Sequence, residues 1–274
     1  MVNHTGQIAD TKNMHGGLVS ISFRKLTARQ IVDAVAAAGL EGIEWGGDIH
    51  APHGDLVRAR EVGAMTREAG LRVAAYGSYY RAGFSEGQGL PFERVLDSAR
   101  ALQAPTIRIW AGVGGSAETD AATRTRIAED SLRVGSMARE QGLGVAFEYH
   151  RGTLTDTRDS TRALLRETEV AGLTCYWQPP VGWNRDERLA SLRDLGAALA
   201  NVHVFQWDDG GERHPLAAGA EAWREVLDLA DAAPPPPDGL PRWALMEFVR
   251  DNTLEQFQRD AAVLRRLLAR HAPH

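Results

Sequence analysis

Short apolar runs alternate with longer segments of helical periodicity from Leu18 to the C-terminal part of the chain. The runs are eight in number and begin near Val19, Gly42, Arg72, Thr106, Gly144, Thr174, Val202 and Arg242. Each is continuously apolar rather than strictly alternating, which is typical of strands in a sheet that helices cover. The pattern therefore predicts an α/β fold in which a helix follows each strand.

Helix start and stop signals separate the apolar runs. Thr27 and Gln30 form a capping box ahead of apolar residues at helical spacing, and Gly39 provides a left-handed stop. Asn252 and Glu255 have the same spacing and predict the start of the last helix. These signals place a helical segment between successive strands.

Eight strand–helix units at spacings of about 23 to 40 residues fit a single (β/α)8 TIM barrel. A doubly wound open sheet is the alternative, but no Gly-x-Gly-x-x-Gly follows the first strand, and polar residues stand at the ends of many strands rather than at one switch point. No linker divides the chain, and the proline run 234–237 is too short to be one. We expect a polar extension over residues 1–17 and one barrel domain over residues 18–274.

Composition restricts the partners of the chain. A net charge of −5 provides no basic surface for duplex nucleic acid. No apolar run of about 18 residues or more is present, so no membrane span is expected. Cys175 is the single cysteine, which excludes an intrachain disulfide and favours a cytoplasmic setting. The expected partner is a small molecule; a homo-oligomer is left open.

Polar residues at the ends of the fifth to eighth strands have the composition of a hard-cation site: Glu148, Gln178, His203 and Glu247. Barrel enzymes carry their sites where the C-terminal ends of the strands meet. Carboxylate, amide and imidazole groups suit Mn²⁺, Mg²⁺ or Co²⁺, with Zn²⁺ an alternative. In a purely structural interpretation, His203 is a hydrogen-bonded core histidine, and the glutamates pair with a buried arginine such as Arg108. Burial of an unpaired carboxylate costs free energy, so three glutamates within apolar strands favour a metal site over the structural interpretation.

Two glutamates beside a metal ion can also move protons. One carboxylate can remove the proton α to a carbonyl that the metal polarises, and the facing one can return it. This is the chemistry of sugar isomerisation and epimerisation. Five tryptophans lie at or just after predicted strand ends: Trp45, Trp110, Trp177, Trp183 and Trp207. Their flat rings suit contact with the C–H faces of a sugar, but they suit a role in covering the barrel core equally well.

Four strand-end motifs resemble the xylose-isomerase-like barrel superfamily: Gly42-Ile-Glu44-Trp45, Phe147-Glu148-Tyr-His150, Asn201-Val-His203 and Met246-Glu247-Phe. This superfamily includes D-psicose and D-tagatose 3-epimerases, hydroxypyruvate isomerase, inosose dehydratase and endonuclease-IV-type enzymes. The resemblance implies that Glu148, His203 and Glu247 bind the metal and that the two glutamates transfer protons. The family pattern has an aspartate where Gln178 stands, so a neutral amide oxygen would complete the ligands.

The resemblance and the strand-end positions together imply a set of substrate-binding residues: Glu44, Trp45, His50, Arg108, Trp110, His150, Trp207 and Arg213. Arg213 is the nearest match to a family arginine that follows the seventh-strand histidine, although it lies farther along the chain. His150, two residues from Glu148 on the same strand face, is expected to contact substrate rather than metal.

The expected activity is a metal-dependent isomerase or epimerase of a sugar or sugar derivative. The alternatives are a metal-dependent dehydratase of a cyclic keto-polyol, of the inosose or dehydroshikimate type, and a non-catalytic sugar-binding barrel. Hydrolysis of damaged DNA would need a histidine-rich trinuclear zinc cluster and a positively charged groove, which this sequence does not provide.

Overall fold

Eight parallel strands close into a barrel in the computed structural model, which describes residues 14–269. The strands pair in chain order, and β8 pairs with β1 to complete the ring. Their bounds are β1 Met14–Val19, β2 Gly42–Gly46, β3 Arg72–Arg81, β4 Thr106–Trp110, β5 Gly144–Glu148, β6 Thr174–Trp177, β7 Leu199–Val204 and β8 Arg242–Met246. The (β/α)8 barrel predicted from the sequence is confirmed.

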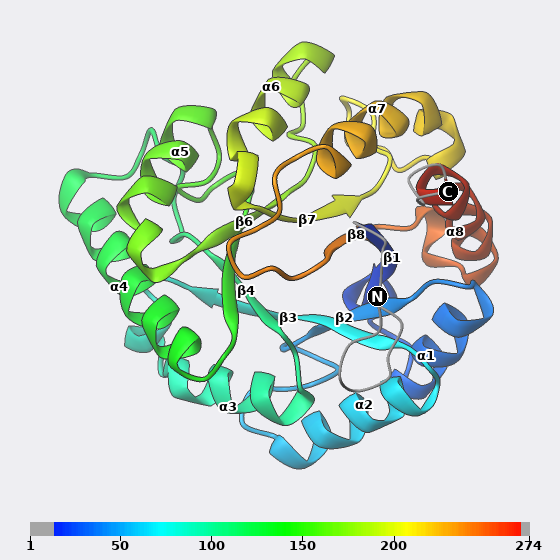
Figure 1. The fold of residues 1–274 in the computed structure, drawn as a ribbon, viewed down its shortest axis with the longest axis horizontal. Coiled ribbons are helices and arrows are strands. Elements are labelled where there is room, and N and C mark those ends of the chain that lie inside the picture. The colour runs from blue at the N-terminus through cyan, green and yellow to red at the C-terminus, as the bar shows by residue number, and fades with distance from the viewer. Residues whose placement is uncertain (1–13, 270–274) are drawn as a thin grey trace, which may run out of the picture.

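The helices form an outer ring around the strands, and α8 lies beside α1 where the ring closes (Figure 1). Their bounds are α1 Ala28–Ala37, α2 Leu56–Glu68, α3 Phe92–Leu102, α4 Ala121–Glu140, α5 Arg158–Glu167, α6 Arg185–Leu195, α7 Ala220–Asp231 and α8 Leu254–Leu268. Gln258 of α8 donates a hydrogen bond to the Ala34 carbonyl of α1 at 3.1 Å, which ties the last helix to the first. Of the helices in residues 14–269, none is both long and apolar enough to cross a membrane.

The first strand lies earlier than the sequence predicted. It covers Met14–Val19, whereas Ser20–Phe23 forms a 3-10 helix, η1. The glycines of this segment interrupt the apolar pattern by which a strand is recognised in a sequence. A Cβ at Gly17 would lie 2.7 Å from the Gly42 carbonyl oxygen, so β1 and β2 require glycine for their close approach. The predicted extension 1–17 is therefore wrong for residues 14–17, and its remainder lies outside the described residues.

The helix caps agree with the sequence at one predicted position and differ at another. Thr27 and Gln30 form the capping box of α1, as predicted. The N-cap of α8 is Thr253, which accepts a hydrogen bond from the Gln256 amide, rather than Asn252. Asn252 adopts a left-handed conformation in the short 3-10 helix η6 (Arg250–Asn252), so its side chain is directed elsewhere.

The apolar core has two layers that the barrel wall separates. The larger layer fills the space between strands and helices, while a small cluster fills the barrel interior: Val19, Ala74, Ala75, Ala146, Tyr176, Trp243 and Leu245. Because residues i and i+2 share a face of a strand, the glutamate of β2 lies on the inner face while its neighbours Ile43 and Trp45 pack outward. Glu44 of β2 and its partner Arg108 of β4 therefore place charged groups inside the barrel.

Candidate active site

A cavity of about 680 Å³ opens where the C-terminal ends of the strands meet. Its base is formed by side chains of β4, β5 and the end of β8, including Arg108, Glu148 and Glu247. The segments after β1, β7 and β8 form its mouth. A cavity of this size and position is where barrel enzymes hold small substrates.

Glu148, His203 and Glu247 form a buried cluster beside this cavity. One ligand atom from each lies within 4.8 Å of the other two. The Nδ1 atom of His203 is 3.5 Å from Glu148 Oε1 and 3.4 Å from Glu247 Oε2. Among the described residues, neither nitrogen of His203 accepts or donates a hydrogen bond, and the same is true of Glu247 Oε2. Buried polar atoms rarely stay unpaired, so this cluster has the features of an ion-binding site.

Arg108 connects this cluster to Glu44 beneath it. Its Nε donates to Glu44 Oε1 at 2.7 Å, and its Nη1 donates to Glu148 Oε2. Glu44 Oε2 lies 3.8 Å from His203 Nε2, on the far side of the ring from Glu148. Gly77 of β3 makes room for this arrangement, since a Cβ there would lie 2.7 Å from Glu44 Oε1 and 2.8 Å from Arg108 Nη2. The purely structural interpretation therefore holds for Glu44, which pairs with Arg108 below the cavity and does not line it.

The two oxygens of Glu148 have different roles. Oε2 accepts hydrogen bonds from Arg108 Nη1 and from Trp110 Nε1. Oε1 faces His203 Nδ1 and makes no such bonds to Arg108 or Trp110. Groups that fix one oxygen of a metal-binding carboxylate typically orient the other toward the ion.

Charge separates the protonation states of the two cluster glutamates. Burial raises the pKa of Glu148, but the charge of Arg108 outweighs burial and holds this pKa well below its usual range. Burial and the charges of Glu148 and Glu44 raise the pKa of Glu247 to about 7, against the lowering effects of His203 and Arg108. Burial lowers the pKa of His203, but Glu247, Glu148 and Glu44 together raise it to about 10. One carboxylate is thus ionised near neutral pH while the other can carry a proton.

Aromatic rings form the cavity wall beside Glu148. The ring of His150 stacks on Trp110 with centroids 4.8 Å apart, and the Arg81 guanidinium lies over the Trp110 ring at 4.1 Å. His150 Nδ1 is 2.6 Å from the Arg151 carbonyl oxygen, which favours a proton on Nδ1 and leaves Nε2 as the acceptor in the neutral ring. Trp110 and His150 therefore lie at the cavity, as a contact with substrate requires.

Gln178 lies on the opposite side of Glu148. Its amide nitrogen donates to the Tyr149 carbonyl at 3.0 Å, so its oxygen is directed away from that bond. It lines a second cavity of about 390 Å³, which shares Glu148, His150 and Phe248 with the first. Gln178 therefore lies on the β6 side of Glu148, which is also a member of the cluster.

The structure does not bring Trp45 and His50 into the cavity. Trp45 points outward from β2, and its indole donates to Thr66 of α2 at 3.1 Å. His50 is buried beside Ser20 Oγ at 3.0 Å and the Leu26 carbonyl at 3.2 Å. Both side chains support the packing of loops and helices on the barrel rather than the site.

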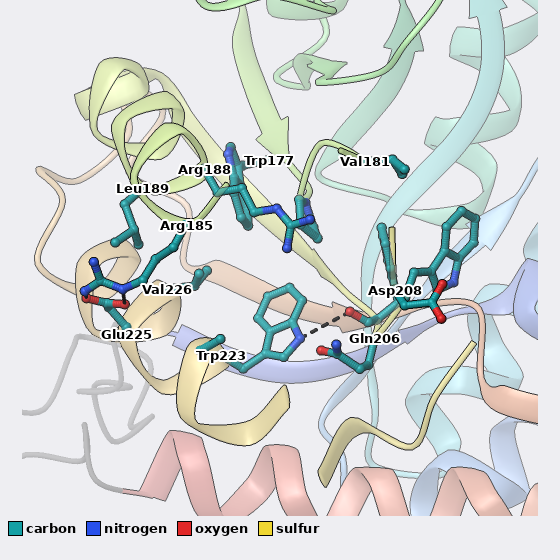
Figure 2. Close-up of a pocket in the computed structure, with 14 residues that line it drawn as sticks. Trp177, Val181, Arg185, Arg188, Leu189, Gln206, Asp208, Trp223, Glu225 and Val226 are labelled. Atoms are coloured by element: carbon teal, nitrogen blue, oxygen red, sulfur yellow. Dashed lines mark hydrogen bonds and ion pairs between the residues drawn. The ribbon is translucent and has the colours of Figure 1, made fainter. Parts of the chain in front are cut away.

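Tryptophans at the ends of β6 and β7 belong to a different hollow. Figure 2 shows a pocket between α6 and α7 in which Trp177 and Trp223 lie close together; their ring centroids are 6.4 Å apart. Trp177 is tied to Ser191 of α6 at 2.9 Å, so it packs the helix layer. Trp207 lines both this pocket and the 390 Å³ cavity. Of these residues, Trp207 is the one placed to contact a molecule near Gln178.

Sequence reasoning assigned no role to several residues of the cavity wall. Lys25 follows η1, and the sequence predicted a strand there, so its place at the mouth was not foreseen. Tyr79 of β3 lies at the cavity with Arg108 5.2 Å from its ring centroid, and burial raises its pKa to about 12. Asn252 lines the mouth beside Arg213, which donates to its Oδ1 at 3.0 Å. A basic pair directly after the first apolar run was the available signal for Lys25.

Fold and site together define a (β/α)8 barrel with a buried carboxylate and imidazole cluster at the C-terminal ends of its strands. The family model of the xylose isomerase-like TIM barrel matches residues 32–267, and the chain belongs to this family. Its recognised members include sugar isomerases and epimerases, the class that the strand-end motifs indicated. No curated protein sequence shows a significant match.

Solved structures share the fold at low sequence identity. The probable 3-DHS dehydratase AsbF of Bacillus anthracis is 20% identical, with a TM-score of 0.76 over 92% of this chain and 98% of that one. A D-psicose 3-epimerase is 15% identical, with a TM-score of 0.69 over 93% and 99%. A xylose isomerase-like TIM barrel protein of Mycobacterium smegmatis, in complex with magnesium, is 14% identical, with a TM-score of 0.64 over 91% of both chains.

Proposed function

We propose that the protein is a divalent-metal-dependent isomerase or epimerase of a sugar or sugar derivative. The observation that carries the proposal is the buried group Glu148, His203 and Glu247, whose ligand atoms lie within 4.8 Å of one another. Within residues 14–269 the ring nitrogens of His203 and Oε2 of Glu247 lie near opposite charges but form no hydrogen bond, which supports the same site. Gln178 would add a fourth, neutral oxygen ligand from β6.

Charge balance supports a divalent ion at this position. Glu44, Glu148 and Glu247 carry three negative charges when ionised, and Arg108 carries one positive charge. A divalent ion in place of the proton on His203 brings the total to zero. Buried carboxylates are stable when they are neutralised in this way. Oxygen and imidazole ligands without a thiolate favour Mn²⁺, Mg²⁺ or Co²⁺ over a structural zinc site.

The residues of the chain then divide the chemistry. A metal ion bound here would polarise the substrate carbonyl and so acidify the neighbouring C–H bond. Glu148 is ionised and held by Arg108 and Trp110, so it is the base that removes this proton. Glu247 is the second carboxylate of the cluster, and in its protonated form it is the group that returns a proton on the other side. Trp110 and His150 form the apolar wall that orients the substrate.

Calorimetric titration with Mn²⁺ tests the metal site. We expect Glu148→Gln and Glu247→Gln each to weaken binding at least tenfold, because each removes a charged ligand. Glu212→Gln is the control, since Glu212 belongs to a second, exposed group of possible ligands with Asp208 and His214. If Glu212→Gln abolished binding while the two cluster variants bound normally, the ion would lie at the surface and the proposal would be wrong.

Proton exchange tests the reaction. The protein with Mn²⁺ is incubated in D₂O with a panel of ketoses, cyclic ketones and their phosphates, and deuterium incorporation is measured. We expect incorporation next to the carbonyl of one member, and its loss in Glu148→Gln. Metal binding without exchange into any member of the panel would instead support a non-catalytic sugar-binding barrel.

A dehydratase of a cyclic keto-polyol is the second candidate, and His150 is the observation that favours it. Elimination requires a further proton donor for the departing hydroxyl group, and the imidazole of His150, which can donate from Nε2 in its protonated form, lines the same cavity as Glu148 and Glu247. His150→Gln separates the two reactions. An isomerase would keep its C–H exchange in this variant, whereas a dehydratase would retain exchange but lose formation of the unsaturated product.

A further inference from the structure

The mouth of the 680 Å³ cavity carries two cationic side chains that form no ion pair with a carboxylate among residues 14–269. Lys25 reaches it from the segment after β1, and Arg213 reaches it from the loop after β7. The other two charged groups at the mouth are already paired. Arg24 binds Asp48 at 2.6 Å, and Asp251 binds the neighbouring Arg250 at 3.0 Å.

Lys25 stands apart from the other cations of the chain. The chain has two lysines against a large number of arginines, and the other lysine is Lys12. Lys25 is exposed, and within residues 14–269 it has no ion pair or hydrogen bond with another residue. A flexible ammonium with three free donors therefore stands at the cavity mouth.

Arg213 is held by neutral groups in the part of the chain that the structure describes. Its Nη1 donates to Asn252 Oδ1 at 3.0 Å, and its guanidinium lies 5.2 Å from the ring centroid of Phe248 and 6.0 Å from that of Trp207. Phe248 and Asn252 both adopt left-handed conformations, with φ of 50° each. Non-glycine residues adopt this conformation at an energetic cost, and such residues cluster at binding sites. The loop after β8 thus fixes a guanidinium whose charge is not compensated.

We propose that Lys25 and Arg213 bind an anionic group of the substrate, a carboxylate or a phosphate ester, away from the reacting carbon. This inference rests on the proposed function. With a divalent ion bound, the charges at the cavity base sum to zero, whereas Lys25 and Arg213 leave positive charge at the mouth, so an anionic group is attracted to the mouth. Arg213 provides planar donors for two oxygens, and Lys25 provides a mobile point charge. The substrate class is accordingly an acidic sugar or cyclic keto-polyol, or its phosphate ester, rather than a neutral sugar.

The scarcity of lysine makes the test direct. In protein labelled with ¹³C-lysine, the ε-methylene groups of Lys12 and Lys25 give separate NMR signals, and Lys25→Met identifies the second. Glucose 6-phosphate, glucuronate and neutral glucose are titrated into the full chain in the presence of Mg²⁺. We expect a saturable shift of the Lys25 signal with at least one anionic sugar and none with glucose. The phosphate and carboxylate arms distinguish the two sources of charge.

Variants complete the test by calorimetry with the anionic sugar that shifts the signal. We expect Arg213→Met and Lys25→Met each to weaken its binding at least tenfold and Lys25→Arg to preserve it. Arg29→Met removes an equal charge from an exposed position of α1, outside the cavity lining, and should leave binding unchanged. Equal binding of glucose and the anionic sugars, or an unmoved Lys25 signal with both anions, would overturn the inference.

Metal titration keeps this inference separate from the proposed function. Lys25→Met does not touch Glu148, His203 or Glu247, so it should bind Mn²⁺ with the affinity of the unmodified chain. A chain that binds Mn²⁺ but no anionic sugar refutes the anion site alone. A chain that binds anionic sugars but no divalent ion refutes the proposed function instead.

Discussion

Replacement of Arg108 by methionine should destabilise the barrel more than any surface change. Arg108 donates to Glu44 at 2.7 Å and also to Glu148, and all three side chains are buried. Removing one member of a buried ionic group costs about 3–5 kcal/mol, because the remaining charges lose their partner. We expect a loss of this size in the free energy of unfolding of Arg108→Met at pH 7.

The loss should depend on pH in a defined direction. Arg108 lowers the pKa values of Glu44 and Glu148, so both rise in the variant. A carboxyl with an ordinary pKa of 4.5 needs about 3.4 kcal/mol to become neutral at pH 7 but only about 0.7 kcal/mol at pH 5. Protonation of the two glutamates thus relieves the variant in acid, and its deficit should shrink to about 2 kcal/mol at pH 5.

Urea unfolding followed by circular dichroism at pH 5 and pH 7 measures both quantities. Arg193→Met, at an exposed position of α6, is the matched control and should change stability by less than about 0.5 kcal/mol. The double variant with Glu44→Gln should be less destabilised than the sum of the single changes, because it removes one stranded charge. A deficit for Arg108→Met below about 1 kcal/mol, or one that does not depend on pH, would refute the reasoning.

Three further outcomes are expected. The pKa of His203 is raised from 6.5 to about 10, so its ionic contribution to stability is complete below pH 6.5 and is lost as the pH rises toward 10. The thermal midpoint in EDTA should fall over this range, and Mn²⁺ should prevent the fall. Gln178→Asp should lower the Mn²⁺ dissociation constant at least tenfold by calorimetry, since it adds a charged ligand; an unchanged constant would place the amide outside the site. Gly77→Ala should lose about 1–3 kcal/mol in urea unfolding, because its methyl group would displace Arg108 or Glu44; full stability would show that the pair can shift freely.

The fold was predictable because its signals are local and repeated. Most strands are apolar runs, and most helices carry a side-chain N-cap, such as the capping box at Thr27 and Gln30. The first strand was misplaced because its buried segment is rich in glycine. Gly17 allows β1 to approach β2 and β8 closely, and these contacts exist only in the closed barrel. The apolar letters of Ser20–Phe23 resembled a strand, yet they form the 3-10 helix that leads to the cavity mouth.

The candidate site was predictable in part. The strand-end positions of Glu148, His203 and Glu247 follow from the barrel order, which is why the sequence could group them. Partners that depend on side-chain direction could not be found in this way. Trp45 and Glu44 are neighbours on one strand, yet the tryptophan packs against α2 while the glutamate enters the barrel interior and pairs with Arg108. The hydrogen bond from Arg213 to Asn252 joins two loops whose residues are 39 positions apart, and no sequence pattern predicts it.

The position of Trp110 gives the protein an optical reporter of its own site. Its indole nitrogen donates to Glu148, and its ring stacks on His150 at the cavity wall. By contrast, Trp45, Trp177 and Trp243 are buried away from the cavity. Any ion or ligand that changes the charge on Glu148 or displaces water from this wall changes the surroundings of one indole among several. Intrinsic fluorescence, compared with that of Trp110→Phe, can therefore follow occupancy before any substrate has been identified.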